Sequence, residues 1–422
     1  MVLTNSDIKE TKVAKDGVSS ATNSPLSYSR IASIDMLRGV AMIIMALDHT
    51  REFFSSATFS PEDLHHTSGP MFITRLVTHF CAPIFFLLAG TGAYLSFSSS
   101  RSKSKMSLFL FTRGLWLVLL ELTVLRFGWN FTFSSPPLLQ VMWALGWSMC
   151  FMALLVWLPT PVLGALAMVG IACHNLLDRL TALPGPQASK LLIFLHVPGF
   201  LTFGSVHLML GYPLIPWVCV MALGYAFAPI LMKENRGRRL ALIGATLTTA
   251  FIIIRGINHY GNAYDGMPSF FPATVGTWTG QKSTAFTVMA FLNTLKYPPS
   301  LDYILMTLGP ALMLLACFEH LRPGTVWGRV LLVYGRVPLF YYLVHVYLIH
   351  ILAILTGLVC HQPIAWLWKS TMLVTTPPPG YGHGLPFIYL TWLTVVALLY
   401  FPCRWFMRFK AQHREWKWLS YI

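Results

Sequence analysis

The chain has 422 residues, of which 55% are hydrophobic and only 11% are charged, and its formal net charge is +15 at pH 7. Soluble domains carry roughly 25% charged residues, so this composition excludes an ordinary soluble protein and indicates an integral membrane protein. The basic residues lie in short runs between apolar stretches. That pattern is typical of cytoplasmic loops and argues against a nucleic-acid partner.

The N-terminal segment is polar and rich in Ser, Thr and Lys. It has no apolar stretch of signal-peptide type, so we expect residues 1–32 to form a disordered cytoplasmic tail. Residues 33–408 hold the apolar segments and are expected to form one transmembrane domain. Residues 409–422 are expected to form a basic cytoplasmic C-terminal tail.

Ten apolar segments of membrane-spanning length follow one another along the chain. They cover residues 34–54, 72–97, 107–127, 137–158, 161–178, 207–231, 239–257, 300–318, 337–359 and 385–407. The predicted fold class is therefore all-α: a polytopic helical bundle of about ten transmembrane helices. The stretch 323–360 is too long for one helix, and we expect "GRVP" (Gly335–Pro338) to break it into an interfacial piece and a span.

The distribution of basic residues predicts the orientation in the lipid bilayer. With the N-terminus inside, most of the 30 Lys and Arg residues fall on the cytoplasmic side. An even number of spans then puts both termini in the cytoplasm. The long loops, 55–71, 179–206, 258–299 and 360–384, lie outside.

The seven cysteines lie in or at the edges of apolar segments and form no Cys-x-x-Cys pair. We therefore expect buried core residues, with no disulfide framework and no metal site.

The first apolar segment is charged at both ends, with Arg38 at one end and Asp48, His49, Arg51 and Glu52 at the other. The ten residues from Arg38 to Asp48 span only about 15 Å of helix, half of a hydrocarbon core. An ionisable residue at such a depth costs roughly 2.5–3.5 kcal/mol to insert, so each is a candidate functional residue.

Asp48 and His49 are the strongest catalytic candidates on these grounds. A carboxylate beside a histidine can hold the tautomer of the imidazole and raise its basicity, as general-base or nucleophilic catalysis requires.

Further polar residues fall in the outer half of the predicted bundle, which indicates a cavity that opens outward. They include Arg75, His79, His174, Asn175, Asp178, His207, Arg255, Asn258, Lys296 and His345. A structural reading stands beside the functional one, because lone histidines often bond a neighbouring carbonyl. Arg75 and Arg255 could also pair with Asp48 or Asp178 to hold the bundle together.

On the inner side, Arg38, Arg113 and Arg336 lie near the predicted cytoplasmic face, and Arg336 comes just before a helix that begins at Pro338. Arginines beside a helix N-terminus suit an anion such as phosphate. Membrane anchoring by the positive-inside rule is the alternative for each arginine alone.

Several stretches resemble the heparan-α-glucosaminide N-acetyltransferase-like family, especially its bacterial branch, within the transmembrane acyltransferases. They run from about Ser33 to Trp405 and read "SIDMLRGVAMIIMALDH", "RLVTHFCAPIFFLLAGTGAYL", "LTVLRFGWNF", "LQVMWALGWSMCFMALLVWLP", "HNLLD", "YPLIPWVCVMALGYAFAP", "LNTLKYPPSLDYILMTLGPAL" and "GRVPLFYYLVHVYLIH". The spacing of Arg38 and His49, with ten residues between them, also resembles the first span of acyltransferase-3 proteins.

The resemblance implies an enzyme that moves an acetyl group from cytosolic acetyl-CoA to an amine or hydroxyl of a sugar or glycan across the membrane. It implies that the CoA phosphates contact Arg38, Arg113 and Arg336, and that His49, with Asp48, is the base or acetyl carrier. The acceptor pocket would be lined by Arg75, His79, Asn175, Arg255, Asn258, Lys296, Tyr297 and His345. The branch resembled implies a bacterial inner membrane, and no metal or haem.

The chain departs from the animal enzyme, which has Asn where His49 falls and a proposed catalytic histidine in the following outer loop. His65 and His66 in "EDLHHTSG" are the nearest candidates here. The sequence leaves open which histidine acts and whether transfer is direct or passes through an acetyl-histidine. It also leaves open the acceptor, the acyl chain length, N- or O-acylation and homo-oligomerisation.

Two other functions fit the composition. A transporter or flippase also uses a polar cavity, but no inverted pair of broken helices is evident. A haem protein could draw on the 14 histidines, but no paired spacing for two axial ligands stands out.

Overall fold

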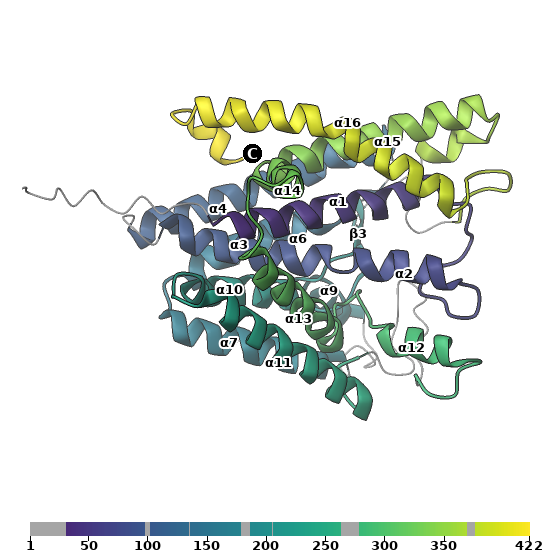
Figure 1. Ribbon diagram of the computed structural model, residues 1–422. Helices are drawn as coiled ribbons and strands as arrows, with labels where there is room; N and C mark the ends of the chain where they lie inside the picture. Colours follow the sequence, from purple (N-terminus) through teal and green to yellow (C-terminus); the bar gives the residue numbers. More distant parts are fainter. Residues whose placement is uncertain are drawn as a thin grey trace, which may run out of the picture. The chain divides into compact units, whose positions relative to one another are not determined.

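A computed structural model describes residues 31–97, 102–134, 136–178, 186–204, 206–262, 278–368 and 376–422. The predicted tail of residues 1–32 falls almost entirely outside these ranges. The described residues are mainly helical, as Figure 1 shows, and the predicted all-α polytopic fold is confirmed.

The elements follow one another in the order expected from the apolar segments. The α-helices are α1 (Ala32–Phe54), α2 (Gly69–Thr78), α3 (Cys81–Phe97), α4 (Lys103–Leu120), α5 (Arg126–Asn130), α6 (Val141–Leu155), α7 (Thr160–Cys173), α9 (Pro186–Leu195), α10 (Leu214–Leu231), α11 (Arg236–Ile257), α12 (Thr284–Leu292), α13 (Leu301–Phe318), α14 (Val326–Arg336), α15 (Pro338–Val359) and α16 (Leu385–Gln412). The shorter turns are the π-helix η1 (Glu121–Leu125) and the 3₁₀-helices η2 (His174–Leu177), η3 (Ile364–Trp368) and η5 (Lys417–Ser420).

Eight helices or helical runs among the described residues are long and apolar enough to cross a membrane. The other two predicted spans correspond to α1, which carries the charged residues noted above, and to α6, which has only 15 residues. The expected break at Gly335–Pro338 is confirmed, because α14 ends at Arg336 and α15 begins at Pro338. Pro338 supplies no N–H, so it starts the new helix rather than continuing the old one.

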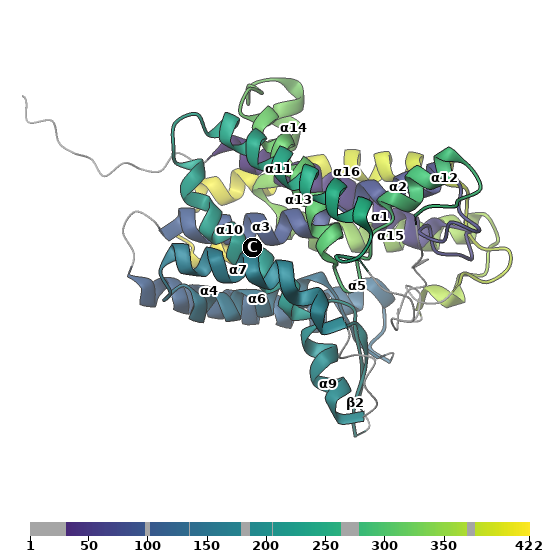
Figure 2. The same cartoon turned by 90° about the horizontal axis from the view of Figure 1, so that it is seen from below.

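The predicted span 207–231 is wrong at its first residues. Val206–Leu210 is strand β3, which pairs antiparallel with β2 (Gly199–Phe203) and parallel with the two-residue β1 (Leu138–Leu139). Pro213 precedes the first residue of α10, so the helix begins only at Leu214. Both the strand and the helix are apolar, which is why their sequence reads as one segment. Figure 2 shows α9 and β2 apart from the long helices.

Helix α1 lies at the centre of the bundle (Figure 1) and packs against α2, α3, α13, α14, α15 and α16. Its contact with α14 depends on two glycines. A Cβ on Gly335 would lie 1.7 Å from the carbonyl oxygen of Asp35, and one on Gly39 would lie 2.1 Å from that of Leu331. Glycine at both positions therefore lets the two backbones touch, as small residues do between membrane helices.

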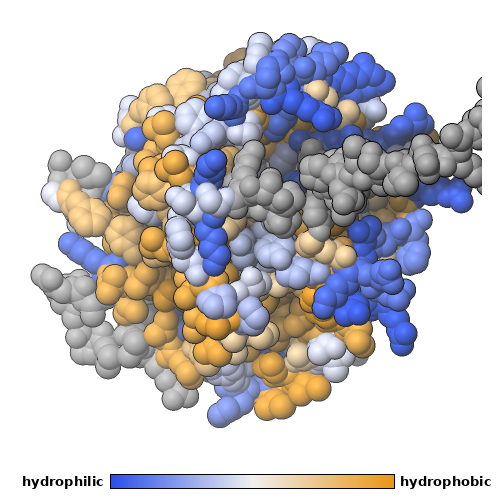
Figure 3. Space-filling view, turned by 90° about the vertical axis from the view of Figure 1, so that its left-hand side faces the viewer, coloured by the Kyte–Doolittle hydropathy of each residue, from blue (hydrophilic) through white to orange (hydrophobic). Residues whose placement is uncertain are grey.

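The C-terminal residues pack against α4, although the sequence suggested a tail at 409–422. The Arg113 guanidinium donates to the Ser420 carbonyl at 2.7 Å, and the Thr112 and Tyr421 hydroxyls lie 2.9 Å apart. Figure 3 shows the side of the molecule that faces left in Figure 1, where patches of hydrophilic residues lie beside hydrophobic ones.

Candidate active site

A pocket lies where α1 passes the junction of α2 and α3. It holds about 330 Å³ of empty space, including its open part. It is lined by Met45, Asp48 and His49 of α1, by Thr78, Cys81, Ala82 and Phe85 near the α2–α3 junction, and by Val141, Tyr212 and Lys296. Both the acid and the imidazole that line this pocket, Asp48 and His49, therefore come from α1.

His49 makes a direct contact with the imidazole of His345, which α15 presents from the other side. Nδ1 of His49 lies 2.7 Å from Nε2 of His345, and the two rings are inclined by only 15° with centroids 4.9 Å apart. This geometry is that of two imidazoles joined edge to edge by a hydrogen bond. His345 is fully buried, whereas His49 is only partly so.

The backbone assigns the tautomers of this pair. Nδ1 of His345 lies 3.0 Å from the Tyr341 carbonyl oxygen, which can only accept, so this nitrogen carries the proton. In a neutral His345, Nε2 must then accept from Nδ1–H of His49. The unprotonated nitrogen of a neutral His49 is consequently Nε2, which has no hydrogen-bond partner among the described residues. The hydrogen bond to His345 therefore leaves a lone pair free on Nε2 of His49, the histidine that lines the pocket.

Aromatic rings hold His49 in place. The rings of Trp129 and Tyr342 lie at 73° and 85° to the imidazole, with centroids 4.9 Å and 6.0 Å away. Because these contacts limit rotation of the imidazole, they keep Nδ1 directed at His345.

Asp48 does not support His49 as expected. Its Oδ1 accepts from Arg51 at 2.8 Å and its Oδ2 accepts from Arg75 at 2.7 Å. Adjacent residues on a helix point in different directions, so a carboxylate at position 48 turns away from an imidazole at position 49. The contact predicted for Asp48 is made instead by His345, the partner of His49 on α15.

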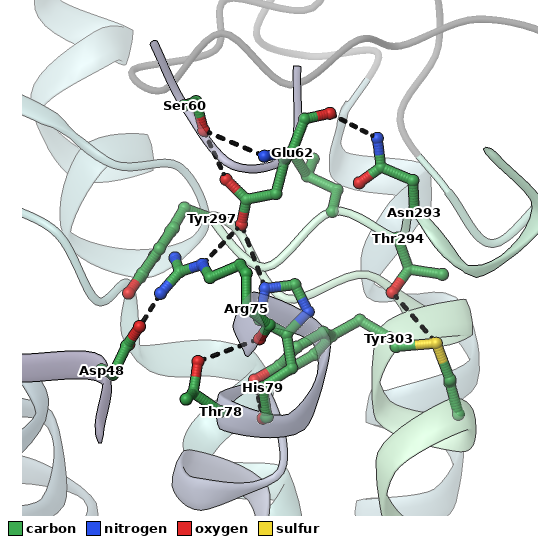
Figure 4. Close-up of polar contacts among 12 residues, drawn as sticks. Asp48, Ser60, Glu62, Arg75, Thr78, His79, Asn293, Thr294, Tyr297 and Tyr303 are labelled. Carbon is green, nitrogen blue, oxygen red and sulfur yellow. Dashed lines mark hydrogen bonds and ion pairs between the residues drawn. The ribbon is translucent and has the colours of Figure 1, made fainter. Parts of the chain in front are cut away.

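Arg75 connects α2 to the outer loop through Glu62, as Figure 4 shows. Its Nε donates to Glu62 Oε1 at 2.9 Å, and His79 Nε2 lies 3.0 Å from the same oxygen. Ser60 donates to the other oxygen of Glu62 at 2.8 Å. Arg75 and His79 thus share one acid, and Arg75 bridges that acid to Asp48.

Glu62 could not be identified from the sequence, because an acid in an outer loop is usually exposed to solvent. In the structure it is buried. Burial alone would raise the pKa of this carboxyl, but the charge of Arg75 and the hydrogen bond to His79 hold its pKa well below the ordinary value. Glu62 is therefore ionised at neutral pH and ties the loop after α1 to α2.

His65 and His66, from the same loop, are exposed. His66 Nδ1 lies 2.6 Å from the carboxylate of Asp63, and neither histidine lines the pocket. Of the two candidate histidine sites, His49 lines the pocket, whereas His65 and His66 lie on the surface.

Lys296 and Tyr297 belong to the turn before α13. Lys296 lines the pocket and is only 6% exposed, and its ammonium lies 5.1 Å from the centre of the Tyr297 ring. The hydroxyls of Tyr297 and Tyr212 lie 3.3 Å apart. This turn therefore brings a cation to the pocket, with the phenol of Tyr297 beside it.

Three predicted acceptor residues make structural contacts away from this pocket. Arg255 donates to the carbonyls of Phe291 and Ala290 at the end of α12 and to the side chain of Asn258, which ends α11 with φ 53°. Asn175 accepts from the N–H of Leu301 at the start of α13. The structure thus supports the structural reading for Arg255, Asn258 and Asn175.

The inner arginines are only partly brought together. Arg38 donates to Asp35 Oδ1 at 3.0 Å, and Nε of Arg336 lies 3.7 Å from Asp35 Oδ2. Their side chains are 19% and 38% exposed. Arg113 lies close enough to experience the charge of Arg38, although its guanidinium also binds the Ser420 carbonyl. Three positive charges therefore collect at the end of α1 away from His49.

Glu121 is a buried acid that the sequence analysis overlooked, although an acid within an apolar segment is a signal. It begins the π-helix η1, and its Oε1 accepts from the N–H of Gln140, the N-cap of α6. π-Helical turns are frequent near functional sites. Here the carboxylate meets the free N–H groups at the start of α6, whose first residue, Val141, lines the pocket.

Among the described residues, no group of three or more His, Cys, Asp or Glu side chains has the arrangement needed to hold a metal ion.

Comparison with known families adds one match. The profile of the family described as heparan-alpha-glucosaminide N-acetyltransferase, catalytic, matches residues 30–261. The chain belongs to this family. It is accordingly a membrane protein of an acetyltransferase family. A search of curated proteins finds no relative. The matched residues include Asp48, His49, Arg75 and His79, whereas Lys296 and His345 lie beyond them.

Proposed function

We propose that this heparan-alpha-glucosaminide N-acetyltransferase family member transfers an acetyl group from cytosolic acetyl-CoA to a sugar amine or hydroxyl on the opposite side of the membrane. The observation that carries the proposal is the His49–His345 pair, which leaves an unprotonated imidazole nitrogen on a histidine that lines the pocket. A buried, oriented imidazole is what general-base catalysis of acyl transfer needs.

In the proposed reaction, Nε2 of His49 removes a proton from the acceptor amine or hydroxyl. The acceptor lone pair attacks the thioester carbonyl carbon, and the electrons of the C=O bond move to oxygen. When this tetrahedral adduct collapses, the C=O bond reforms and the C–S bond breaks. The proton held by His49 then passes to the leaving thiolate, which gives CoA and the acetylated acceptor.

The donor enters from the inner end of α1 in this proposal. Arg38, Arg113 and Arg336 bind the phosphates of CoA, because cations beside the start of α15 attract anions. His49 lies eleven positions after Arg38, about 16 Å along the helix. An extended pantetheine chain can bridge that separation and bring the thioester to the pocket.

The experiment is a measurement of CoA release from acetyl-CoA by the purified protein, with a panel of amino sugars and cell-envelope glycans. We expect release to depend on one class of acceptor. His49→Ala should lower kcat by about 10²–10⁴-fold, the usual contribution of a general base. His66→Ala is the matched control and should retain wild-type turnover.

Two results would contradict the proposal. One is the absence of acceptor-dependent CoA release over the whole panel. If the protein also transports a solute without acetyl-CoA, it is a transporter. The other is wild-type turnover by a folded His49→Ala variant. A bacterial inner membrane is the location that we propose from the resemblance, with the N-terminus in the cytoplasm as the basic loops predict.

A further inference from the structure

One cation that lines the pocket has no acidic partner. Lys296 is 6% exposed and lies on the same pocket as His49 and Asp48. Throughout the ranges that the structure describes, no carboxylate forms an ion pair with its ammonium, although Arg51 and Arg75 each do so with Asp48. The face of the Tyr297 ring lies 5.1 Å from the ammonium, and the carboxylates of Asp48 and Glu52 are near enough for the lysine charge to act on them.

The nearby acids are already occupied by other groups. Asp48 uses one oxygen for Arg51 and the other for Arg75. Glu62 is bound on both oxygens, by Arg75 and His79 on one and by Ser60 on the other. Both oxygens of Asp48 and of Glu62 are therefore bound by groups other than Lys296.

The backbone holds Lys296 in an ordered turn. Residues 296 and 299 form an isolated antiparallel bridge, and Ser300 donates its N–H to the Leu295 carbonyl at 2.9 Å. The N–H of Leu295 is bound by the side chain of Asn262 at 2.9 Å. Ser300 then caps α13 by accepting from the N–H of Tyr303. Such a turn fixes the position from which the lysine side chain extends.

Lys296 forms no direct ion pair, and the nearby carboxylate of Asp48 is bound by two arginines, so the position favours a further negative charge that arises beside the ammonium. The proposed reaction creates one such charge, on the acetyl carbonyl oxygen of the tetrahedral adduct. Preoriented cations in an enclosed site stabilise an oxyanion more than they do in water.

We propose that Lys296 is a catalytic residue that binds the oxyanion of this adduct, in the pocket that His49 also lines. The inference rests on the proposed function. Lys296 forms no covalent bond: the negative oxygen lies against its ammonium while the acceptor–carbon bond forms, and it becomes neutral again when the C–S bond breaks.

The test compares Lys296→Met with Lys296→Arg, which keeps the charge, in the CoA-release assay. We expect Lys296→Met to lower kcat by about 10²–10³-fold, as removal of an oxyanion donor does, with KM for acetyl-CoA and acceptor changed less than threefold. Lys296→Arg should retain more activity than Lys296→Met. Lys282→Gln, an exposed lysine before α12, is the control and should match the wild type.

Elution as a single species and an unchanged Tm verify folding, and Lys296→Gln replaces Lys296→Met if the latter fails this check. A folded variant with wild-type kcat overturns the inference. So does an effect confined to KM for acceptors that carry a carboxylate, since Lys296 would then recognise the acceptor. If the wild type releases no CoA with any acceptor, the proposed function fails as well. If the wild type releases CoA and Lys296→Met has the same activity, the inference about Lys296 fails while the proposed function stands.

Discussion

His49 depends on a partner that lies 296 positions away in the sequence. The proton that His345 donates to the Tyr341 carbonyl leaves Nε2 of His345 as an acceptor, and this in turn leaves Nε2 of His49 unprotonated. In the proposed reaction, His345 is thus a positioning residue, which acts on the substrate only through His49.

The role of His345 predicts different effects for two substitutions. His345→Phe removes the acceptor for Nδ1–H of His49, and we expect kcat to fall about 10²-fold with little change in KM. His345→Gln should recover much of this loss, because an amide oxygen at the same reach can accept the hydrogen bond. Steady-state kinetics test the pair. Equal losses in both variants, with an unchanged pH profile, would mean that His345 only fills space.

Glu62 predicts a pH dependence of stability. Its pKa in the folded protein lies well below 4.5, so the ionised form stabilises the fold above pH 4.5, and this stabilisation is lost as the pH falls through the folded pKa. Glu62→Gln leaves Arg75 without one of its acids and should lower the free energy of unfolding by about 3 kcal/mol at pH 7.

The Tm difference between wild type and Glu62→Gln should therefore be largest near pH 7 and shrink below pH 4.5. Thermal unfolding in detergent at several pH values measures it. Asp63→Asn, in the same loop, is the control and should change Tm little, since its partner His66 is exposed. A Tm difference that stays constant from pH 7 to pH 3 would contradict this account of Glu62.

At the scale of elements, the contact between α1 and α14 sets the inner end of the site. It brings Asp35 of α1 within reach of Arg336 of α14, with Arg38 on the other carboxylate oxygen. The absence of side chains at Gly39 and Gly335 makes this possible, because each glycine meets the backbone of the opposite helix.

A single methyl group should disturb this contact. Gly335→Ala places its Cβ 1.7 Å from a backbone oxygen, so α1 and α14 must separate, at a cost of about 1–3 kcal/mol. Gly92→Ala in α3 is the matched control for Gly335→Ala, because a Cβ at position 92 meets nothing within 4 Å. It should leave Tm unchanged or raise it. Equal Tm values for the two variants would show that the glycine contact is unimportant.

At the scale of the whole molecule, the sequence predicts more of the fold than of the site. Apolar length predicted the helices, and Pro338 predicted the break between α14 and α15, because both signals are local. Strand β3 was not predicted, because an apolar strand that leads into an apolar helix has the sequence pattern of a single span. The partner of His49 and the burial of Glu62 depend on which distant segments meet, and periodicity carries no such information.

The residues of the proposed path lie along one helix, from Arg38 at the inner end of α1 to His49 at the pocket. The central claim is that an acetyl group travels along this path from one side of the membrane to the other. Sealed proteoliposomes of one orientation test it most directly, with labelled acetyl-CoA on the side of Arg38 and the acceptor enclosed on the side of the outer loops.

The account predicts labelled acceptor inside wild-type vesicles, with free CoA remaining outside and only background label with His49→Ala. Acceptor that is labelled only when it shares a compartment with acetyl-CoA would contradict it.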